Sequence, residues 1–183
     1  TNKYRLLHVS CFDEKAKNIQ GLLRAARAVA NQRQDFELVV VGTGIDYQVD
    51  RSYADKLDFP PEMLHFTGEQ TPYEVAQWMQ ESDAFVLFSR YETYAVVLAE
   101  AVATGLPIIS TSTAGIASEL PEGCRVTIEN ENEEQLAVAI QHILNRKKEY
   151  NKEYIKKHSQ CFHAQEVGKS LLAIYDRCLH SHI

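Results

Sequence analysis

Two glutamates in an otherwise apolar stretch are the residues of this chain best suited to chemistry. Glu92 and Glu100 stand eight positions apart in "SRYETYAVVLAEAVATGLPIIST", residues 89–111. A carboxylate oxygen accepts hydrogen bonds from neighbouring hydroxyls, so this pair suits a polyhydroxyl ligand. Helical spacing of about 1.5 Å per residue puts the two acids too far apart to share one proton. The competing interpretation is that Glu100 faces solvent, although its small apolar neighbours leave little room for a polar outer face.

Two lysines add positive charge in a second segment, "HVSCFDEKAKN", residues 8–18. Lys15 and Lys17 come just before an expected helix, whose N-terminal N–H groups and dipole favour an anion. The competing interpretation is a pair of solvated lysines on a loop. A third segment, "VVVGTGID", carries Gly42 and Gly44 but lacks the third glycine of the dinucleotide-binding fingerprint. We interpret it as a tight turn that only glycine can make.

Alternating strands and helices must position these three segments. Short apolar runs rich in β-branched residues predict strands at Arg5–Ser10, Phe36–Val41, Met63–Phe66, Ala84–Phe88, Pro107–Thr111 and Arg125–Ile128. Helical periodicity predicts helices at Ile19–Asn31, Tyr47–Leu57, Pro72–Glu81, Val96–Thr104 and Glu133–Asn145, with a helical tail from about Lys148 to His180. This alternation predicts an α/β fold, a doubly wound, Rossmann-like sheet of six parallel strands with helices on both faces. Ligands bind such sheets at the carboxyl ends of the strands, where all three segments fall.

The helix that carries Glu100 supplies the remaining chemistry. Its N-terminus, expected near Tyr94 to Val97, would offer backbone N–H groups to a phosphate. A phosphate next to a set of hydroxyls describes a nucleotide sugar. The sequence therefore favours a nucleotide sugar as the ligand of this sheet edge.

Composition limits the possible functions. The chain has 183 residues, 45% of them hydrophobic, which suffices for one globular domain with its own core. A net charge of −6 argues against a nucleic acid partner, because nucleic acids bind basic surfaces. No apolar run is long enough to span a membrane, and no signal peptide is recognisable. The four cysteines lack C-x-x-C spacing, so we expect reduced thiols and a cytoplasmic protein.

Neither a metal nor a cofactor is expected. The seven histidines form no H-x-x-x-H or H-E-x-x-H cluster. The chain also enters an apolar run within a few residues of Thr1. We interpret this start as that of a piece of a longer protein.

These segments resemble retaining glycosyltransferases of the GT-B fold, in the large GT4 family. The resemblance rests on Glu92-x7-Glu100 followed by "AVATGLPIISTSTAGIASEL", and on "KN", "VVVGTG", "FTGEQTPYEVAQWMQESDAFVLFS" and "QEVGKSLLAIYDRCL" in the family's order. It covers nearly the whole chain. It implies that residues 1–183 are a single nucleotide-sugar-binding domain, the C-terminal half of a two-domain enzyme whose N-terminal acceptor-binding domain is absent from this sequence.

The resemblance also assigns roles to individual residues. It implies that Glu92 holds hydroxyls of the donor sugar and that Lys17 meets the diphosphate, which makes these two the catalytic residues. It implies that Glu100 binds the ribose, with Lys15 replacing Lys17 if the loop register is shifted. The other donor-binding positions that it implies are Gly42, Gly68, Glu69, Tyr94, Ala95, Val96 and Val97.

The implied reaction moves a sugar from a nucleoside diphosphate to an acceptor hydroxyl, with retention at the anomeric carbon and without a metal. Polysaccharide or glycolipid synthesis is the expected setting. The family commonly has glycines on either side of an aromatic residue in the sugar loop, where this chain has Thr93 and Ala95 around Tyr94. Side chains there narrow the approach, so we expect an altered sugar preference.

A second departure concerns the diphosphate. Many relatives carry an arginine ahead of the lysine, where this chain has Cys11, Asp13 and Glu14. An acidic replacement weakens diphosphate binding unless Lys15 reaches in or Arg90 compensates. The sequence leaves both possibilities open.

Other classes of protein share parts of this pattern. A response-regulator receiver needs a lysine after its fifth strand, where "PIISTSTAG" has none, and a dinucleotide-binding oxidoreductase needs glycine after its first strand, where "SCFDEKAKN" has none. A sugar-nucleotide epimerase of the GT-B fold binds the same ligand at the same strand ends. It stays open as the alternative, as does a non-catalytic nucleotide-binding domain.

A basic segment near the C-terminus raises the question of a membrane. Residues 145–158 hold six Lys or Arg against two Glu. A solvated helix with interleaved charges is the simpler interpretation. Docking on the anionic inner face of the cytoplasmic membrane, where lipid-linked acceptors lie, is the alternative.

Overall fold

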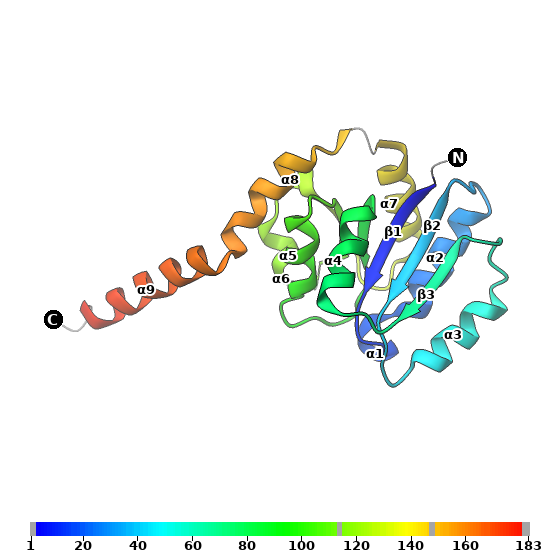
Figure 1. Cartoon of the computed structure of the whole chain (residues 1–183), viewed down its shortest axis with the longest axis horizontal. Helices are drawn as coiled ribbons and strands as arrows, with labels where there is room; N and C mark the ends of the chain where they lie inside the picture. Colours follow the sequence, from blue (N-terminus) through cyan, green and yellow to red (C-terminus); the bar gives the residue numbers. More distant parts are fainter. Residues whose placement is uncertain (1–2, 113–114, 147–148, 181–183) are drawn as a thin grey trace.

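The computed structural model describes residues 3–112, 115–146 and 149–180. Its centre is one six-stranded sheet with helices on both faces (Figure 1). The strands are β1 (Tyr4–Val9), β2 (Phe36–Val41), β3 (Leu64–Gly68), β4 (Ala84–Leu87), β5 (Ile108–Thr111) and β6 (Arg125–Ile128). Each neighbouring pair of strands is parallel. The predicted doubly wound α/β fold is therefore confirmed.

The longer helices lie close to where the periodicity predicts them. They are α2 (Ile19–Ala30), α3 (Tyr47–Lys56), α4 (Pro72–Glu81), α5 (Val96–Ala103) and α7 (Glu133–Arg146). The sequence analysis missed the short helices α1 (Glu14–Lys17) and α6 (Gly115–Glu119), and the 3-10 turns η1 (Glu122–Cys124) and η3 (Ser159–Phe162). Elements of three to five residues are too short to show a helical period in their apolar residues.

The C-terminal tail is helical, as predicted, but it is divided into separate pieces. Residues 147 and 148, where the tail was expected to begin, lie outside the described residues. Beyond them the chain forms α8 (Lys152–His158), the turn η3 and α9 (Ala164–His180). Ile155 of α8 is buried against the domain, whereas α9 projects away from it (Figure 1).

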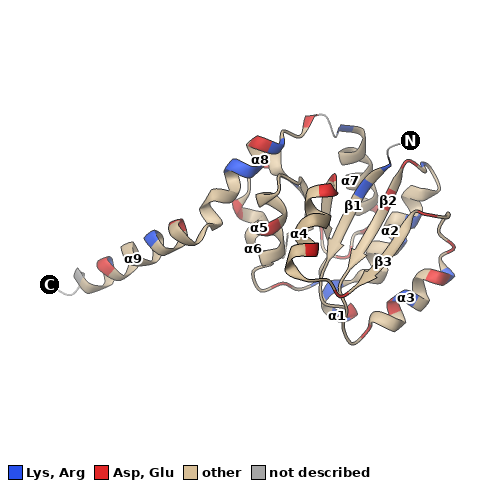
Figure 2. Ribbon diagram, viewed as in Figure 1, with Lys and Arg blue, Asp and Glu red and all other residues tan. Residues whose placement is uncertain are grey.

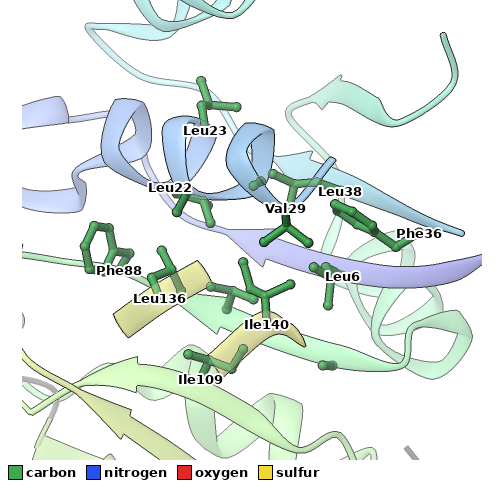
Figure 3. Packing of buried hydrophobic residues seen from close by; sticks show 14 of the residues in the cluster. Leu6, Leu22, Leu23, Val29, Phe36, Leu38, Phe88, Ile109, Leu136 and Ile140 are labelled. Carbon is green, nitrogen blue, oxygen red and sulfur yellow. The ribbon is translucent and has the colours of Figure 1, made fainter. Parts of the chain in front are cut away.

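Two hydrophobic cores, one on each face of the sheet, hold the layers together. Leu6 and Leu38 point to the face covered by α2 and α7, where Figure 3 shows them packed with side chains of both helices. Leu7 and Val39, one position further along the same strands, point to the opposite face, which is covered by α4, α5 and α8. Both faces are buried, so the strands read as continuous apolar runs without polar alternation.

The order of the strands fixes where a ligand can bind. It is β3-β2-β1-β4-β5-β6, so β1 and β4 are neighbours although they are far apart in the chain. After β1 the chain passes to α2 on one face, and after β4 it passes to α5 on the other. The connections therefore diverge at the carboxyl ends of these two strands and leave a crevice there.

Gly42 shapes one side of this crevice. Its φ of +127° lies in a region that side-chain-bearing residues rarely adopt, and a Cβ atom built on it would lie 1.9 Å from the carbonyl oxygen of Ser10. The end of β2 thus presses directly on the first residue after β1. The predicted glycine turn is confirmed, and its consequence is to fix the backbone of Ser10.

We expect Gly42→Ala to lower the free energy of unfolding by about 2 kcal/mol or more, because the methyl group meets backbone at a positive φ. Urea denaturation measures the change. Gly168→Ala is the matched control, since a Cβ there meets nothing within 4 Å; we expect it to change stability by less than about 1 kcal/mol. Equal midpoints for the two variants would contradict the close packing at Gly42.

Candidate functional site

A cleft of about 750 Å³ opens at the divergence between β1 and β4. Its walls come from the ends of β1 and β4, from α1, from one face of α4 and from the loop and first turns of α5. The lining residues are Val9, Ser10, Cys11, Lys17, Gln70, Pro72, Val75, Ala76, Met79, Leu87, Glu92, Thr93, Ala95, Val96, Val97, Glu100, Ala103 and Thr104. Most of these side chains are apolar or small, and the few polar ones are available to orient a ligand.

Lys17 and Glu92 meet in this cleft. Lys17 Nζ lies 2.7 Å from Glu92 Oε1, and the two side chains are 16% and 8% exposed. The same carboxylate oxygen accepts a 2.6 Å hydrogen bond from Ser89 Oγ. Within the described residues, Glu92 Oε2 has no hydrogen-bond partner. The pair therefore keeps a carboxylate oxygen and two ammonium N–H groups available to a ligand.

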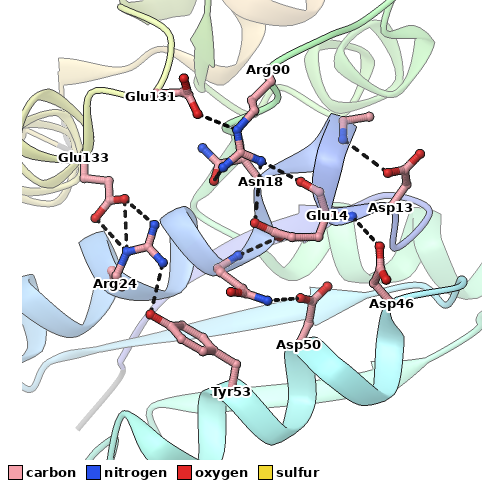
Figure 4. A network of polar contacts seen from close by, with 12 residues as sticks. Asp13, Glu14, Asn18, Arg24, Asp46, Asp50, Tyr53, Arg90, Glu131 and Glu133 are labelled. Carbon is pink, nitrogen blue, oxygen red and sulfur yellow. Dashed lines mark hydrogen bonds and ion pairs between the residues drawn. The ribbon is translucent and has the colours of Figure 1, made fainter.

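The acids that replace the family's arginine are used in helix caps. Asp13 Oδ1 accepts from the N–H of Ala16 at 3.3 Å and caps α1. Glu14 Oε2 accepts from the N–H of Gln20 at 3.0 Å, in the first turn of α2 (Figure 4). Neither acid lines the cleft. The sequence suggested that these acids would repel a diphosphate. This repulsion is reduced, because both carboxylates are held at helix N-termini.

Arg90 does not face the cleft either. Its guanidinium donates to the carbonyl of Glu14 at 2.6 Å, to Asn18 Oδ1 at 2.7 Å and to Glu131 Oε1 at 2.6 Å (Figure 4). Its backbone N–H donates to the carbonyl of Ala16 at 2.8 Å. Arg90 thus ties the loop that carries Glu92 to the helix that carries Lys17. All of these partners belong to the protein, so the suggested compensation at a diphosphate finds no support in this arrangement.

Glu100 lines the cleft from α5 and is exposed. The helix begins at Val96, as the periodicity predicted, so Glu100 lies little more than one turn along it. Within the described part of the chain it makes no ion pair or hydrogen bond through its side chain. Glu100 is therefore neither buried among its small neighbours nor committed to another residue, and its carboxylate is open to a ligand.

The N-terminus of α5 explains one feature of the family pattern. Ala95 caps this helix in the left-handed conformation, with φ 60° and ψ 55°, although it is not a glycine. This conformation costs most residues about 1–2 kcal/mol, whereas glycine, which the resemblance implies near this position, adopts it readily. Val96 and Val97 follow as the first helical residues, whose N–H groups have no partner within the helix.

Five of the predicted site residues lie outside the lining of the cleft. They are Lys15, Gly42, Gly68, Glu69 and Tyr94. Lys15 and Glu69 are exposed, and Gly68 is still part of β3, with its carbonyl accepting from the N–H of Gly42 at 2.9 Å. Tyr94 packs toward α6, where its carbonyl accepts from the N–H of Ile116. The residues that the structure brings together are Lys17, Glu92, Ala95, Val96, Val97 and Glu100.

Sequence reasoning missed the wall of the cleft that α4 provides. Gln70 follows β3, and Val75 and Met79 lie one helical turn apart on the inner face of α4. The signal was present in "EQTPYE": Thr71 and Glu74 form a capping box that fixes where α4 begins. The base-binding loop was predicted at Gly68 and Glu69, one residue short of Gln70. β3 runs on to Gly68, so the loop that follows it begins later than predicted.

His8 is buried beneath the cleft and is neutral. Its Nδ1 lies 2.9 Å from the carbonyl oxygen of Val86, and its Nε2 lies 2.7 Å from Ser10 Oγ. Burial lowers the pKa of His8 to about 4, and the positive charge of Lys17 acts in the same direction. The imidazole thus links β1 to β4 and to Ser10, which lines the cleft.

Asp50 is a buried acid behind α1. Its Oδ1 accepts from Gln20 Nε2 at 2.9 Å (Figure 4), whereas its Oδ2 has no partner among the described residues. Burial, together with the nearby charges of Glu14 and Asp46, raises the pKa of Asp50 to about 6. At neutral pH the ionised carboxylate is therefore a local source of instability.

The described residues contain neither a membrane-spanning helix nor a metal-binding cluster. No helix in residues 3–112, 115–146 and 149–180 is long and apolar enough to cross a membrane. In the same ranges, no three His, Cys, Asp or Glu side chains are grouped so that they could hold a metal ion.

Comparison with known proteins identifies the family. The model of the family described as glycosyl transferases group 1 matches residues 3–146, which include every residue that lines the cleft. The chain belongs to this family of glycosyltransferases.

Individual relatives agree with this assignment. An N-acetyl-alpha-D-glucosaminyl L-malate synthase of Bacillus anthracis is 31% identical over 118 residues, covering 64% of this chain and 30% of that protein. A GDP-mannose-dependent alpha-mannosyltransferase of Mycolicibacterium smegmatis is 30% identical over 126 residues, covering 67% and 32%. The matches thus span about a third of the length of these relatives.

Solved structures show the same fold. A lipopolysaccharide outer core galactosyltransferase superposes with a TM-score of 0.82 at 19% identity, over 99% of this chain and 50% of that one. Sucrose-phosphate synthase from Thermosynechococcus elongatus superposes with a TM-score of 0.83 at 21% identity, over 98% and 46%. The chain therefore has the fold of one half of a GT-B glycosyltransferase.

We expect Asp50→Asn to raise the free energy of unfolding at pH 7.5 by about 1–3 kcal/mol, because it removes a buried charge. The folded-state pKa of about 6 exceeds the unfolded value, so Asp50 costs stability as pH rises from about 4 to above 6. The advantage of the variant should accordingly vanish near pH 4. Urea denaturation at several pH values measures it, with the exposed Asp55→Asn on the same helix as the control. Destabilisation by Asp50→Asn at every pH would contradict this account.

Proposed function

We propose that this chain is the donor-binding domain of a retaining glycosyltransferase that transfers a sugar from a nucleoside diphosphate to an acceptor hydroxyl. One observation carries the proposal: in a chain of the group 1 glycosyltransferase family, Lys17, Glu92 and Glu100 line a single cleft at the divergence of β1 and β4. A lysine and two carboxylates at that position suit a ligand with a diphosphate between two sets of hydroxyls.

Each residue then has a role in the transfer. The bond between the anomeric carbon and the diphosphate oxygen breaks, and its electron pair stays on the diphosphate. Lys17 and the N–H groups at the start of α5 face this developing charge and stabilise it. Glu92 holds hydroxyls of the sugar, and Glu100 holds those of the ribose. The acceptor oxygen then bonds to the anomeric carbon and gives its proton to the departing diphosphate oxygen, with no metal or other cofactor proposed.

The identity of the donor can be tested directly on this chain. A ligand that binds only the folded state raises the melting temperature by mass action. A thermal-shift panel of UDP-, GDP- and ADP-sugars, each with its free nucleoside diphosphate, would identify the base. Relatives in the family use different donors, as the name of the GDP-mannose-dependent enzyme indicates. A panel without any shift would contradict the proposed function.

The alternatives named from the sequence are less well supported. The names of the relatives describe synthases and transferases, which favours transfer over epimerisation. A non-catalytic domain would not need the Lys17–Glu92 pair to be held by Arg90 and Ser89. Release of free nucleoside diphosphate by the full-length enzyme, in the presence of an acceptor, separates a transferase from both alternatives.

The acceptor side of the enzyme is proposed to lie in a second domain. The superposed galactosyltransferase is about twice as long as this chain, and 99% of this chain, α9 included, superposes on it. Exposed apolar residues follow one another along α9: Val167, Leu171, Leu172, Ile174, Tyr175 and Leu179. A second domain that covers this surface is the partner we propose.

Peripheral binding to the inner face of a membrane is a further part of the proposal. The basic segment is not one helix, because α7 ends at Arg146 and α8 begins at Lys152. On α8, Lys156 pairs with Glu153 at 3.2 Å. Charges of both signs are spread along the ribbon (Figure 2).

We expect Glu100→Gln to weaken binding of both the free nucleoside diphosphate and the intact donor, each by roughly 1–3 kcal/mol, through loss of charge-assisted hydrogen bonds to the ribose. Calorimetric titration measures both affinities. Glu134→Gln, at an exposed position on α7, is the control and should change neither. An unchanged affinity for the free nucleotide would refute the ribose assignment.

Glu92→Gln should change the affinities for the intact donor and for the free nucleoside diphosphate differently. It weakens binding of the intact donor, because a sugar contact is lost, while binding of the free nucleoside diphosphate is retained or improved. The reason is that Lys17, which now pairs with Glu92 at 2.7 Å, gains freedom to meet the diphosphate. The same titrations measure the difference, and equal losses for both ligands would show that Glu92 does not contact the sugar.

A further inference from the structure

Ser10 lies at the floor of the cleft, and the structure determines whether its hydroxyl group donates or accepts hydrogen bonds there. It is the first residue after β1, it lines the cleft with Lys17 and Glu92, and it is partly exposed. Its backbone is fixed from below by Gly42. None of the roles proposed above uses its hydroxyl group.

The polarity follows from the imidazole of His8. The carbonyl oxygen of Val86, 2.9 Å from His8 Nδ1, can only accept a hydrogen bond, so Nδ1 must carry the proton. A neutral imidazole has a single N–H, which leaves Nε2 as an acceptor. Ser10 Oγ, 2.7 Å from Nε2, therefore donates its one hydrogen atom to His8.

The neutral state of His8 is itself a consequence of its surroundings. The side chain is completely buried, on the strand that passes between β2 and β4. Burial lowers the pKa of His8 to about 4, so the doubly protonated ring, which could donate to Ser10, is absent at neutral pH. The direction of the hydrogen bond is thus fixed at neutral pH.

The hydroxyl of Ser10 consequently offers only lone pairs to the cleft. An oxygen in that state accepts from a hydroxyl or an amide N–H, and it cannot donate to a phosphate oxygen. The Oε2 atom of Glu92, which has no partner among the described residues, is another acceptor. The charges of Glu92 and Lys17 also act on His8, whose Nε2 accepts from the hydroxyl of Ser10. The floor thus offers hydrogen-bond acceptors on Ser10 and Glu92, and Lys17 is a donor in the same cleft.

We infer that Ser10, oriented by His8, is a specificity-determining residue that accepts a hydrogen bond from a hydroxyl or amide N–H of the transferred sugar and keeps phosphate oxygens away from this position. The inference rests on the proposed function. It adds a neutral sugar contact to the charged one of Glu92, and it makes the buried His8 a positioning residue that sets which ligand group can lie above Ser10.

Substitutions of Ser10 test the contact itself. With the nucleoside diphosphate and nucleotide sugar that give the largest thermal shift in the panel as probes, we expect Ser10→Ala to weaken binding of the intact sugar roughly 2- to 10-fold. Binding of the free nucleoside diphosphate should stay within about twofold, because no phosphate contact is lost. Ser10→Thr, which keeps a hydroxyl, should preserve the ratio of the two affinities. Equal losses for both ligands, or no loss, would overturn the inference.

Substitutions of His8 test the polarity. In His8→Asn the amide nitrogen can replace Nδ1 and donate to Val86, but nothing replaces the acceptor Nε2, so the hydroxyl hydrogen of Ser10 is released. We expect tighter binding of the free nucleoside diphosphate and weaker discrimination in favour of the sugar. In His8→Gln the amide oxygen can replace Nε2 and hold the hydrogen, so the wild-type ratio should return. A loss of folding common to both variants would show in their melting curves, and the Ser10 variants then decide alone.

The result also separates this inference from the function on which it rests. If the unsubstituted chain binds no nucleotide and no nucleotide sugar, the proposed function and the role of Ser10 are both refuted. If it binds them and Ser10→Ala leaves the ratio of affinities unchanged, only the role of Ser10 is refuted.

Discussion

The site depends on how the segments after β1 and β4 are held together. These strands are neighbours, yet the chain leaves them for opposite faces of the sheet, so nothing in the sheet itself closes the gap. Hydrogen bonds from the N–H groups of Arg90 and Tyr91 to the carbonyl of Ala16 join the two segments, and the guanidinium of Arg90 adds two more bonds. The Lys17–Glu92 pair lies just inside this junction. Removing either charged partner would leave the other largely buried and uncompensated, which is costly.

This junction also explains why so many acids can lie near a proposed diphosphate site. Asp13 and Glu14 are directed at the N–H groups of α1 and α2, where the helix dipoles favour them. The backbone carbonyl of Glu14 also accepts a hydrogen bond from the guanidinium of Arg90. The replacement of an arginine by acids in this loop thus changes which helix ends are capped, and the positive charge facing the cleft comes from Lys17 alone among these residues.

Local patterns were sufficient to predict the fold and only part of the site. The six strands and five longer helices follow from periodicity, because both sheet faces are buried and each helix has an apolar side. Glu92 and Glu100 were predicted because they stand near the end of a strand and the start of a helix, whereas Lys17 was preferred to Lys15 because of the resemblance to the GT4 family. The order of the strands, by contrast, comes from tertiary packing, and so does the contact between Lys17 and Glu92 across 75 positions. The α4 wall was missed for a similar reason, since Gln70 and Met79 face the cleft only because α4 lies across the sheet in this direction.

The polar groups of the cleft are arranged so that a ligand need not break their mutual contacts. Glu92 uses one oxygen for Lys17 and Ser89 and keeps the other, and the ammonium group of Lys17 keeps two N–H groups after bonding Glu92. Ser10 uses its hydrogen for His8 and keeps its lone pairs. Under the proposed function, the diphosphate would meet donors that are already oriented and the sugar would meet acceptors that are already oriented. Such preorganisation avoids reorganising the site as charge develops on the leaving diphosphate, which is where electrostatic stabilisation of a transfer reaction is most effective.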